Sequence, residues 1–481
     1  MLRHAHIAVV SLGLLLGTAG CNEFLTGDKL STDPNNPAAA TIQTLLVGIQ
    51  GGQFAFQEGT AAAMVCMWVQ QCGATNGRYV EQAGRYVFGA GSNIGANGGD
   101  WATVYTGGGL IDMDAIATLA MRAGDSLYLG IDLVWKAFTV GSATDLWGSI
   151  PYSQIRTNAT PALDSQLVVY DAVQAMLSRA IAALRSGVTT LPPPGDRDLV
   201  FKGDTASWIA TANTLKARYW MHVAEAAANG LISASPYDSA LKYASLGIRS
   251  PAGDFRAFHS GDGYPQSNEW FTFQDNSAFG GDLESGKALV DYMNGRTDPR
   301  RADYFCQNGA GGYVGDDFNV AQTDVSAFDC EPLRFSADFR MPYVTYQENE
   351  LILAEASYAL ANEPQARLHL DNAYAVVPGL ASRAGTATGA ALLDSIMMEK
   401  YVVMFQNIEA LSDYRRTCIP SLTPVTPNVL GLAAVPGELF YPQTERNANS
   451  NIPAESQEVN AGVRTQSDVT PCTGPGAQAY P

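Results

Sequence analysis

The sequence has few charged residues, and fewer basic than acidic ones. Asp, Glu, Lys and Arg make up only 16% of its 481 residues, and 29 basic residues stand against 47 acidic ones, which gives a formal net charge of −18. A nucleic-acid-binding protein needs basic patches to neutralise phosphates, so this balance excludes that class. No internal apolar run reaches the roughly 20 residues of a membrane span. With 46% apolar residues the chain can still build a packed core, so we expect it to fold.

Signatures of common catalytic, metal and nucleotide sites are also missing. The sequence contains no GxSxG, HExxH or CxxC. Residues 281–287 begin like a phosphate-binding loop, but Ala288 stands where a Ser or Thr would hold magnesium. Residues 89–95 have one residue too many for a dinucleotide site. We therefore expect no cofactor, no metal and no catalytic residue, and we interpret His222 as a packed core histidine rather than a base.

Two kinds of acidic site remain as alternatives, because their residues come together in the folded protein rather than in the sequence. A carboxylate pair would serve glycoside hydrolysis, and loop aspartates would bind calcium, although no EF-hand spacing is present. With 47 acidic residues in the chain, such groups arise readily by chance. The loop acids that come into question for the hydrolase are Asp262, Glu269, Asp275 and Asp282.

The N-terminus has the three parts of a secretory signal. A short basic start at 1–4 precedes an apolar run at 7–16 and small residues up to Gly20. A Cys directly after small residues is what lipoprotein processing needs, although Thr18 stands where a Leu is expected. We predict a lipoprotein signal peptide at 1–20, lipid on Cys21 and a polar tether at 21–40. The alternative is ordinary cleavage near Ala19, with Cys21 as a plain thiol.

Six cysteines remain after Cys21. In an exported protein they favour disulfides, and too few histidines survive signal removal to make zinc a good alternative. Other connectivities are possible. Closure is easiest over short separations, so proximity suggests the pairs Cys66–Cys72, Cys306–Cys330 and Cys418–Cys472.

The segment 41–481 reads as helices separated by Gly-, Asn- and Pro-rich loops. Apolar residues from Val169 to Leu184 recur at helical spacing, and Gly187 with the prolines at 192–194 ends that helix. Thr205 is a plausible cap for the next helix. Strand-like alternation is scarce, so we predict a mainly all-α fold, a superhelix of helical hairpins. Further helices are expected at 109–122, 127–143, 239–248, 284–294, 347–361, 364–376 and 390–414.

Two long segments, 73–100 and 250–346, show little helical period. They are rich in Gly, Asn and aromatic residues. Loops of this length inside a compact domain are usually functional or disordered, and their aromatics argue against disorder.

Five segments, taken together, resemble the SusD/RagB family of nutrient-binding outer-membrane lipoproteins. Each is weak alone, but their order and spread cover nearly the whole chain. The Arg415-Arg416-Thr417 ending and the Y-P-x-x-E tail are similar to one SusD-like branch. The segments are Cys21–Leu25, Asp145–Tyr152 (DLWGSIPY), Phe201–Asp204 with Trp208, Asn213, Leu215 and Arg218, Tyr343–Leu360, and Glu399–Thr417 followed by Phe440–Glu445, Asn447 and Asn449.

The resemblance implies a scaffold of tetratricopeptide-like hairpins with an irregular subdomain. It also implies a lipid-anchored protein on the extracellular face of the outer membrane, lying over a TonB-dependent barrel of the SusC type. Such a protein captures an oligosaccharide, or sometimes a peptide, without cleaving it. The charged signature residues Arg218, Glu355 and Arg415 lie on predicted buried faces, so we interpret them as braces between hairpins. A protein-interaction scaffold and a glycoside hydrolase remain the alternative functions.

Loop aromatics are the expected ligand contacts, because sugars stack on flat rings and bind amide and carboxylate groups. Trp101, Trp135, Trp147, Trp208 and Trp220 are assigned to the core by their helical or signature context. We expect Trp270→Ala to weaken ligand binding and to leave folding intact. The alternative for every aromatic is a small satellite core beneath its loop. The predicted ligand-binding residues are Tyr79, Tyr264, Trp270, Phe271, Tyr313, Asn268 and Asp275.

Overall fold

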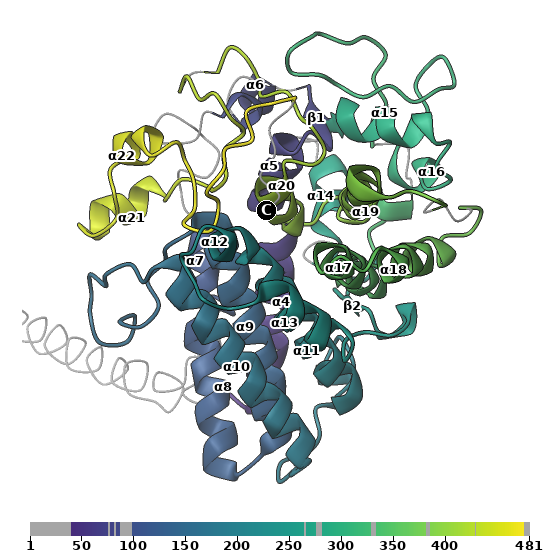
Figure 1. Ribbon diagram of the computed structural model, residues 1–481. Coiled ribbons are helices and arrows are strands. Elements are labelled where there is room, and N and C mark those ends of the chain that lie inside the picture. The colour runs from purple at the N-terminus through teal and green to yellow at the C-terminus, as the bar shows by residue number, and fades with distance from the viewer. Residues whose placement is uncertain are drawn as a thin grey trace, which may run out of the picture.

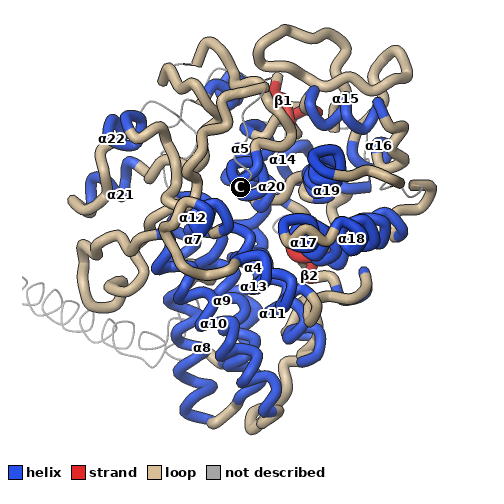
Figure 2. Tube along the Cα trace, in the orientation of Figure 1, coloured by secondary structure: helices blue, strands red, loops and turns tan. Residues whose placement is uncertain are grey.

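The computed structural model describes residues 40–75, 77–80, 83–86, 99–263, 266–275, 281–328, 333–380, 385–428 and 430–475. Most of the described chain is helical, as predicted, and its strands are short (Figures 1 and 2). The expected signal peptide, the lipid site at Cys21 and nearly all of the tether lie outside the described residues and stay predictions.

Long helices form a bundle in the lower half of Figure 1. Neighbours in the chain pack against each other as hairpins, and α4 lies along α8. By length and composition α10 is the one described helix that would qualify as a membrane span, but its apolar face, including Val169, Leu177 and Ala180, is buried in this bundle. The bundle helices are α4 (Ile42–Glu58), α8 (Leu110–Ala123), α9 (Ser126–Trp147), α10 (Gln166–Ser186) and α11 (Thr205–His222).

A second group of helices continues the superhelix. α17 lies at its centre and packs against the other three, while α13 also packs against α11 and so connects the group to the bundle. This arrangement confirms the predicted all-α architecture of helical hairpins. The group consists of α13 (Pro236–Ala244), α17 (Tyr346–Ala359), α18 (Glu363–Ala375) and α19 (Gly389–Val403).

Polar caps and glycines set the helix ends. α10 ends at Gly187, whose φ of 64° is the left-handed conformation that glycine adopts at low cost. The cap of α11 is Asp204 rather than the expected Thr205, because its carboxylate accepts a hydrogen bond from Ser207 N. α17 begins with a capping box in which Thr345 and Glu348 satisfy each other's backbone N–H groups.

Several expected helices have different bounds in the structure. For example, α13 runs from Pro236 to Ala244 rather than over 239–248, and α9 continues beyond residue 143 to Trp147. The segment 390–414 is not one helix: α19 ends at Val403, and a second helix, α20, runs from Glu409 to Thr417. Gln406 lies between them at φ 68°, a left-handed conformation that ends helical hydrogen bonding. The helix expected from residue 284 starts only at Lys287, because Leu283–Ser285 forms a strand.

Short antiparallel pairings order the two irregular segments: one pairing joins the start of 73–100 to 250–346, and the other lies within 250–346. β1 (Cys72–Ala74) pairs with β3 (Leu283–Ser285), and β2 (Phe255–Arg256) pairs with β4 (Pro342–Val344). The remaining elements are short. They are α5 (Thr60–Trp68), α6 (Gly77–Val80), η1 (Ala83–Arg85), α7 (Gly99–Tyr105), η2 (Gly195–Arg197), α12 (Ala224–Ala228), η3 (Pro251–Gly253), α14 (Glu269–Asp275), α15 (Lys287–Gly295), α16 (Arg301–Tyr304), η4 (Leu333–Phe335), α21 (Gln443–Ala448) and α22 (Glu455–Asn460).

An aromatic cluster joins the bundle to these strands. Trp135 of α9 and Trp208 of α11 lie edge-on to Phe255 of β2, with ring centroids 4.9 and 5.7 Å apart. Tyr343 of β4 contacts the same phenylalanine at 5.6 Å. These rings are almost fully buried, and edge-to-face pairs add to the gain from burial itself. Trp101 and Trp147 are also buried, as predicted, whereas Trp220 is half-buried.

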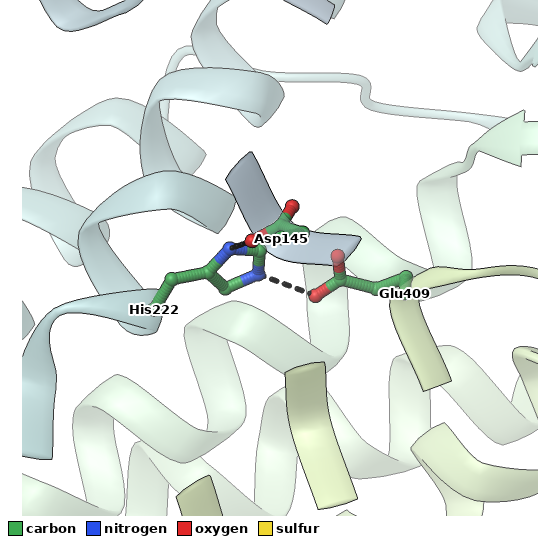
Figure 3. A group of neighbouring side chains, drawn as sticks. All are labelled: Asp145, His222 and Glu409. Atoms are coloured by element: carbon green, nitrogen blue, oxygen red, sulfur yellow. Dashed lines mark hydrogen bonds and ion pairs between the residues drawn. The ribbon is translucent and has the colours of Figure 1, made fainter. Parts of the chain in front are cut away.

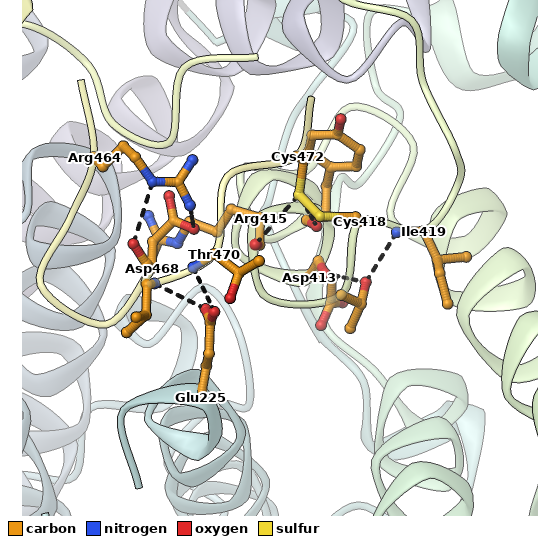
Figure 4. The surroundings of a disulfide bond; sticks show 12 residues. Glu225, Asp413, Arg415, Cys418, Ile419, Arg464, Asp468, Thr470 and Cys472 are labelled. Carbon is orange, nitrogen blue, oxygen red and sulfur yellow. Dashed lines mark hydrogen bonds and ion pairs between the residues drawn. A yellow bond between two sulfur atoms is a disulfide. The ribbon is translucent and has the colours of Figure 1, made fainter. Parts of the chain in front are cut away.

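Two of the predicted disulfides are present. Cys66–Cys72 links the end of α5 to β1, and Cys418–Cys472 links the end of α20 to the C-terminal segment (Figure 4). Cys306 is disulfide-bonded as well, but its expected partner Cys330 lies outside the described residues.

Candidate functional site

The structure corrects the expected exposure of three predicted ligand residues. Trp270 belongs to helix α14 and is only 1% exposed, and Tyr79 of α6 is 4% exposed, so neither ring offers a face to a ligand. Asn268 is fully buried: its Oδ1 accepts hydrogen bonds from the N–H groups of Trp270 and Phe271, and its Nδ2 donates to Glu58. Tyr79 and Trp270 belong to the main apolar core of the described chain rather than to a separate small core beneath a loop.

Glu58 holds the segment that carries Asn268 and Trp270 against the core. Its carboxylate, fully buried at the end of α4, accepts hydrogen bonds from Tyr343 Oη at 2.5 Å and Asn268 Nδ2 at 3.1 Å, and His259 Nε2 lies 2.9 Å away. It also accepts one from the N–H of Glu269 at 3.3 Å. A buried carboxylate must be paired in this way, and the pairing draws the 259–269 segment onto the core.

The other predicted ligand residues are not brought together by any contact in the described chain. Phe271 and Tyr313 are half-buried, and Arg301 lies over the Tyr313 ring, 5.2 Å from its centroid. Tyr264 and the side chain of Asp275 lie outside the described residues. Of the predicted aromatics in the described chain, Phe271 and Tyr313 therefore keep exposed ring surface.

A cleft of about 380 Å³ lies between α7, the 151–161 loop and α21. We call it the α7–α21 cleft. Small-molecule sites have volumes of this order. It combines aromatic and apolar surface with a few hydrogen-bonding groups. Its principal lining residues are Trp101, Tyr105, Arg156, Asn158, Glu445 and Asn449.

The aromatic side of this cleft is held by the core. The Trp101 ring lies edge-on to Trp147 and Tyr441, with centroids 5.2 and 5.6 Å apart. Tyr105, one turn further along α7, is half-buried and donates a hydrogen bond from Oη to the Pro151 carbonyl at 3.1 Å. Burial, together with nearby Glu445, raises the pKa of Tyr105 well above its usual value, so its hydroxyl stays protonated.

The polar side of the cleft is also ordered. Arg156 is exposed, and its Nε and Nη2 donate to Asp114 Oδ2 at 2.8 and 2.5 Å. Asn449 Nδ2 donates to the Pro161 carbonyl at 2.8 Å and so fixes the loop to the end of α21. A preformed wall of this kind binds a ligand with little loss of side-chain entropy.

The sequence analysis missed this cleft. Trp101 is a core residue, as predicted, but its ring also lines one edge of the cleft. Two signature segments, 145–152 and 440–449, supply lining residues. Their meeting with α7 depends on tertiary contacts, such as the 2.5 Å hydrogen bond from Tyr441 Oη to the Ser149 carbonyl.

A buried cluster of Asp145, His222 and Glu409 joins α9, α11 and α20 (Figure 3). His222 Nδ1 lies 2.7 Å from Asp145 Oδ1, and Nε2 lies 2.7 Å from Glu409 Oε1. Burial alone would lower the pKa of His222, but the two carboxylates outweigh it and raise the pKa to about 9. The ring is therefore an imidazolium that neutralises two acids.

The donor atoms of this cluster lie within 4.8 Å of one another, as a metal site would require. Two guanidiniums already face them: Arg218 lies 3.6 Å from Glu409, and Arg415 lies 3.4 Å from Asp145. A cation would have to displace the ring protons of His222 and approach these positive charges, so the geometry fits a structural ion-pair network better. Asp145 of α9 thus pairs with His222 of α11 and Arg415 of α20, and so connects three helices.

Other signature charges also pair between hairpins, as predicted. Arg416 of α20 contacts Glu355 of α17, with Nη2 and Oε2 2.7 Å apart. Lys400 of α19 lies 2.7 Å from Asp413. All four side chains are buried. The first bridge spans 61 positions of the sequence, from α17 to α20, and the second joins the consecutive helices α19 and α20.

Comparisons with known proteins agree with this architecture. Residues 34–442 match the SusD-like family described as “Starch-binding associating with outer membrane”. The fold is similar to that of a chitin-binding protein (19% identity, 89% of this chain and 100% of that chain covered, TM-score 0.70) and of a chitin-binding SusD homolog from Flavobacterium johnsoniae (21%, 90% and 99%, 0.70). It also resembles a SusD/RagB family protein from Bacteroides thetaiotaomicron (18%, 91% and 100%, 0.66).

The search of curated proteins finds no match to this sequence. The family match nevertheless spans most of the chain, and the solved structures share its helical scaffold over nearly their whole length. The chain belongs to the SusD-like family.

Proposed function

We propose that the protein binds an oligosaccharide at the outer-membrane surface, without cleaving it, and passes it to a TonB-dependent transporter of the SusC type. The observation that carries this proposal is the family match over residues 34–442, in a family described as starch-binding and associated with the outer membrane. Two similar structures are described as chitin-binding. Lipid on Cys21 would hold the protein at the extracellular face.

The α7–α21 cleft is our candidate for the oligosaccharide site. Sugar rings present apolar C–H faces and a rim of hydroxyls, and the cleft supplies Tyr105 beside Arg156, Asn158 and Glu445. Its volume suits one or two sugar units of a longer chain. Phe271 and Tyr313 remain candidates for a further contact in the 250–346 segment.

Non-catalytic binding accords with the location of the acidic groups. Among the described residues, the carboxylates of Asp145 and Glu409 lie close together, but they are buried behind two arginines. A hydrolase would need such a pair open to substrate and water. A surface scaffold is the remaining alternative, and it predicts assembly without any affinity for sugar.

The test is calorimetric titration of the full mature chain with chitotetraose and with maltotetraose. We expect one of them to bind, with no released sugar after long incubation. Tyr105→Ala should weaken binding about tenfold, the range of a lost stacking contact. Phe258→Ala, an exposed ring outside the cleft, is the matched control and should leave affinity unchanged.

Three results would count against the proposal. Turnover of either sugar would show an enzyme. A complete lack of affinity for glycans, together with capture of a partner protein, would favour the scaffold. Binding that is unaffected by Tyr105→Ala would move the site away from the α7–α21 cleft. Co-purification of a large barrel protein from native outer membranes tests the transporter itself.

A further inference from the structure

A second pocket, of about 350 Å³, lies between β2, β4, α16 and the end of α18. We call it the Arg334 pocket. It is on the α16–α18 side of Figure 1, whereas the α7–α21 cleft is on the α21 side. The residues that matter here are Arg256, Arg300, Asp303, Tyr304, Arg334 and Phe339.

The Arg334 guanidinium lies in this pocket among aromatic rings. The residue is 8% exposed, and its guanidinium carbon lies 4.9, 5.1 and 5.5 Å from the ring centroids of Tyr304, Phe339 and Phe405. Nε donates to Gln406 Oε1 at 3.1 Å, and Nη2 donates to the Phe405 carbonyl at 2.9 Å. The rings and these two bonds fix the plane of the guanidinium, while Nη1 has no acceptor among the described residues.

This arginine differs from the other buried arginines of the described chain in having no carboxylate partner. Arg300 contacts Asp298 and Glu399, while Arg218, Arg415 and Arg416 contact Glu348, Asp145 and Glu355. An isolated buried charge costs several kcal/mol unless something compensates it. Burial lowers the pKa of Arg334, and neighbouring Arg256 and Arg300 add to that effect.

The surrounding charges do not supply the missing anion. Arg256, at the rim, is already paired with Asp254, 2.7 Å away, and Arg300 is saturated by its two acids. Asp303, an exposed residue that also lines the pocket, acts on Arg334 through its charge but forms no ion pair with it. The pocket therefore contains one buried guanidinium, that of Arg334, which has no carboxylate partner and whose Nη1 keeps its N–H bonds free among the described residues.

We propose that the Arg334 pocket binds an oxyanion, a carboxylate or sulfate group, carried by a small molecule. A guanidinium held in one plane matches the geometry of such a group, and Arg256 at the rim adds a second cation. Tyr304 and Phe339 would pack against the uncharged part of the ligand. This site goes beyond the proposed function, because no neutral glycan requires it.

The experiment uses the full mature chain in chloride buffer at constant ionic strength. Sodium glucuronate, glucose and sodium sulfate are titrated in turn, and binding is followed by calorimetry. We expect saturable binding of glucuronate or sulfate and none of glucose. Glucuronate preferred over sulfate identifies an acidic sugar as the ligand class. Sulfate bound equally or better identifies a free or esterified oxyanion, and both results support the site.

Three variants locate the binding. Arg334→Met should weaken it about tenfold or more, since hydrogen bonds to a charged group are lost. Arg256→Gln should weaken it by a smaller factor, about threefold, because its charge is partly screened at the rim. Arg179→Gln, an exposed arginine of α10, is the matched control and should change nothing.

Two results overturn the proposal. One is the absence of any oxyanion binding above that of chloride. The other is binding that Arg334→Met and Arg256→Gln leave intact. Circular dichroism checks folding first, and if Arg334→Met does not fold, Arg334→Lys replaces it, because it keeps the charge but loses the planar pair of donors.

Discussion

The Arg218 guanidinium meets the Glu348 carboxylate at two points, with Nε 2.5 Å from Oε1 and Nη2 2.6 Å from Oε2, and both side chains are almost fully buried. The pair ties α11 of the bundle to α17 of the second helix group. Arg218 also donates to the Tyr343 carbonyl at 2.6 Å. The junction between the two groups is therefore made by charge as well as by apolar packing.

We predict that Arg218→Met lowers the free energy of unfolding by about 3–5 kcal/mol, because it leaves a buried carboxylate without its partner. Urea denaturation of the exported chain measures this. The double variant Arg218→Met/Glu348→Gln is the control and should lose less than the sum of the two single variants. Strict additivity would show that the two residues do not interact in the folded protein.

His222 should make stability depend on pH. The pKa of this ring is about 9 in the folded protein and about 6.5 when unfolded, so its contribution is complete below pH 6.5 and is lost as pH rises through 9. The free-energy advantage of the wild type over His222→Gln should shrink by roughly 3 kcal/mol between these limits. Wild type and variant are compared at the same pH, so the titration of other groups cancels in the difference between their unfolding free energies. Asp468, with its pKa of about 7, is one such group.

His369→Gln serves as the control for that experiment, because His369 lies at the α18 surface with a 20% exposed side chain. His369 contacts one carboxylate, that of Glu350, whereas His222 contacts two, so an advantage that shrinks only for His222 identifies the buried cluster as its source. An advantage of the wild type over His222→Gln that stays constant from pH 6 to pH 10 would contradict the doubly paired imidazolium.

The two described disulfides should contribute unequally. Cys418–Cys472 closes a separation of 54 residues and Cys66–Cys72 only 6, and a longer loop removes more entropy from the unfolded chain. Replacing the first pair by Ala should cost about 4 kcal/mol and the second about 2 kcal/mol. Urea midpoints of the two double variants decide the order. The reverse order would mean that native-state effects, not loop entropy, dominate.

Trp270→Ala should now damage folding rather than spare it. The side chain is 1% exposed, and truncation of a buried Trp typically costs about 3–5 kcal/mol. Thermal and urea unfolding provide the measurement. Phe271→Ala, one residue along and half-buried, is the control and should cost clearly less. If both variants lose an equally small amount of unfolding free energy, Trp270 is exposed in solution, as the sequence suggested.

The anchor prediction concerns Cys21, which lies outside the described residues. Replacing it by Ala should remove the acceptor for lipid and release the protein in soluble form, because acyl chains supply most of the membrane affinity. Fractionation of cells after a high-salt wash measures this. A Thr18→Leu variant, which strengthens the signal, should stay bound. Retention of Cys21→Ala in washed membranes would show a different anchor.

Local patterns predicted the scaffold well. The helical spacing of apolar residues in α10 and the end of this helix at Gly187 depend only on residues close together in the sequence. Both can therefore be predicted from the sequence. The break between α19 and α20 was not readable, because the left-handed residue there is Gln406 rather than a glycine. The charged signature residues were interpreted correctly as buried braces, since a charge on an apolar helix face needs a partner.

The candidate sites were harder to predict, because they depend on contacts across hundreds of residues. The Gly- and Asn-rich sequence around Trp270 is typical of an exposed loop. In the structure, hydrogen bonds to Glu58 of α4, about 210 positions earlier, hold that segment against the core. The α7–α21 cleft combines α7, a loop after α9 and a helix near the C-terminus. No local signal shows that Tyr105 and Glu445 face one space.

The partners of Glu58 also bear on how the chain can mature. Three of them, His259, Asn268 and Tyr343, lie 201, 210 and 285 positions after Glu58 in the sequence. The buried carboxylate at the end of α4 therefore has its full set of hydrogen-bond partners only when more than half of the chain has followed. Solenoids of independent repeats tolerate loss of their last units. Here a chain that stops before β4 would leave the Glu58 carboxylate without Tyr343, so we expect α4 to reach its native packing only when β4 is present. Truncated products would accordingly be substrates for proteolysis, not smaller binding modules.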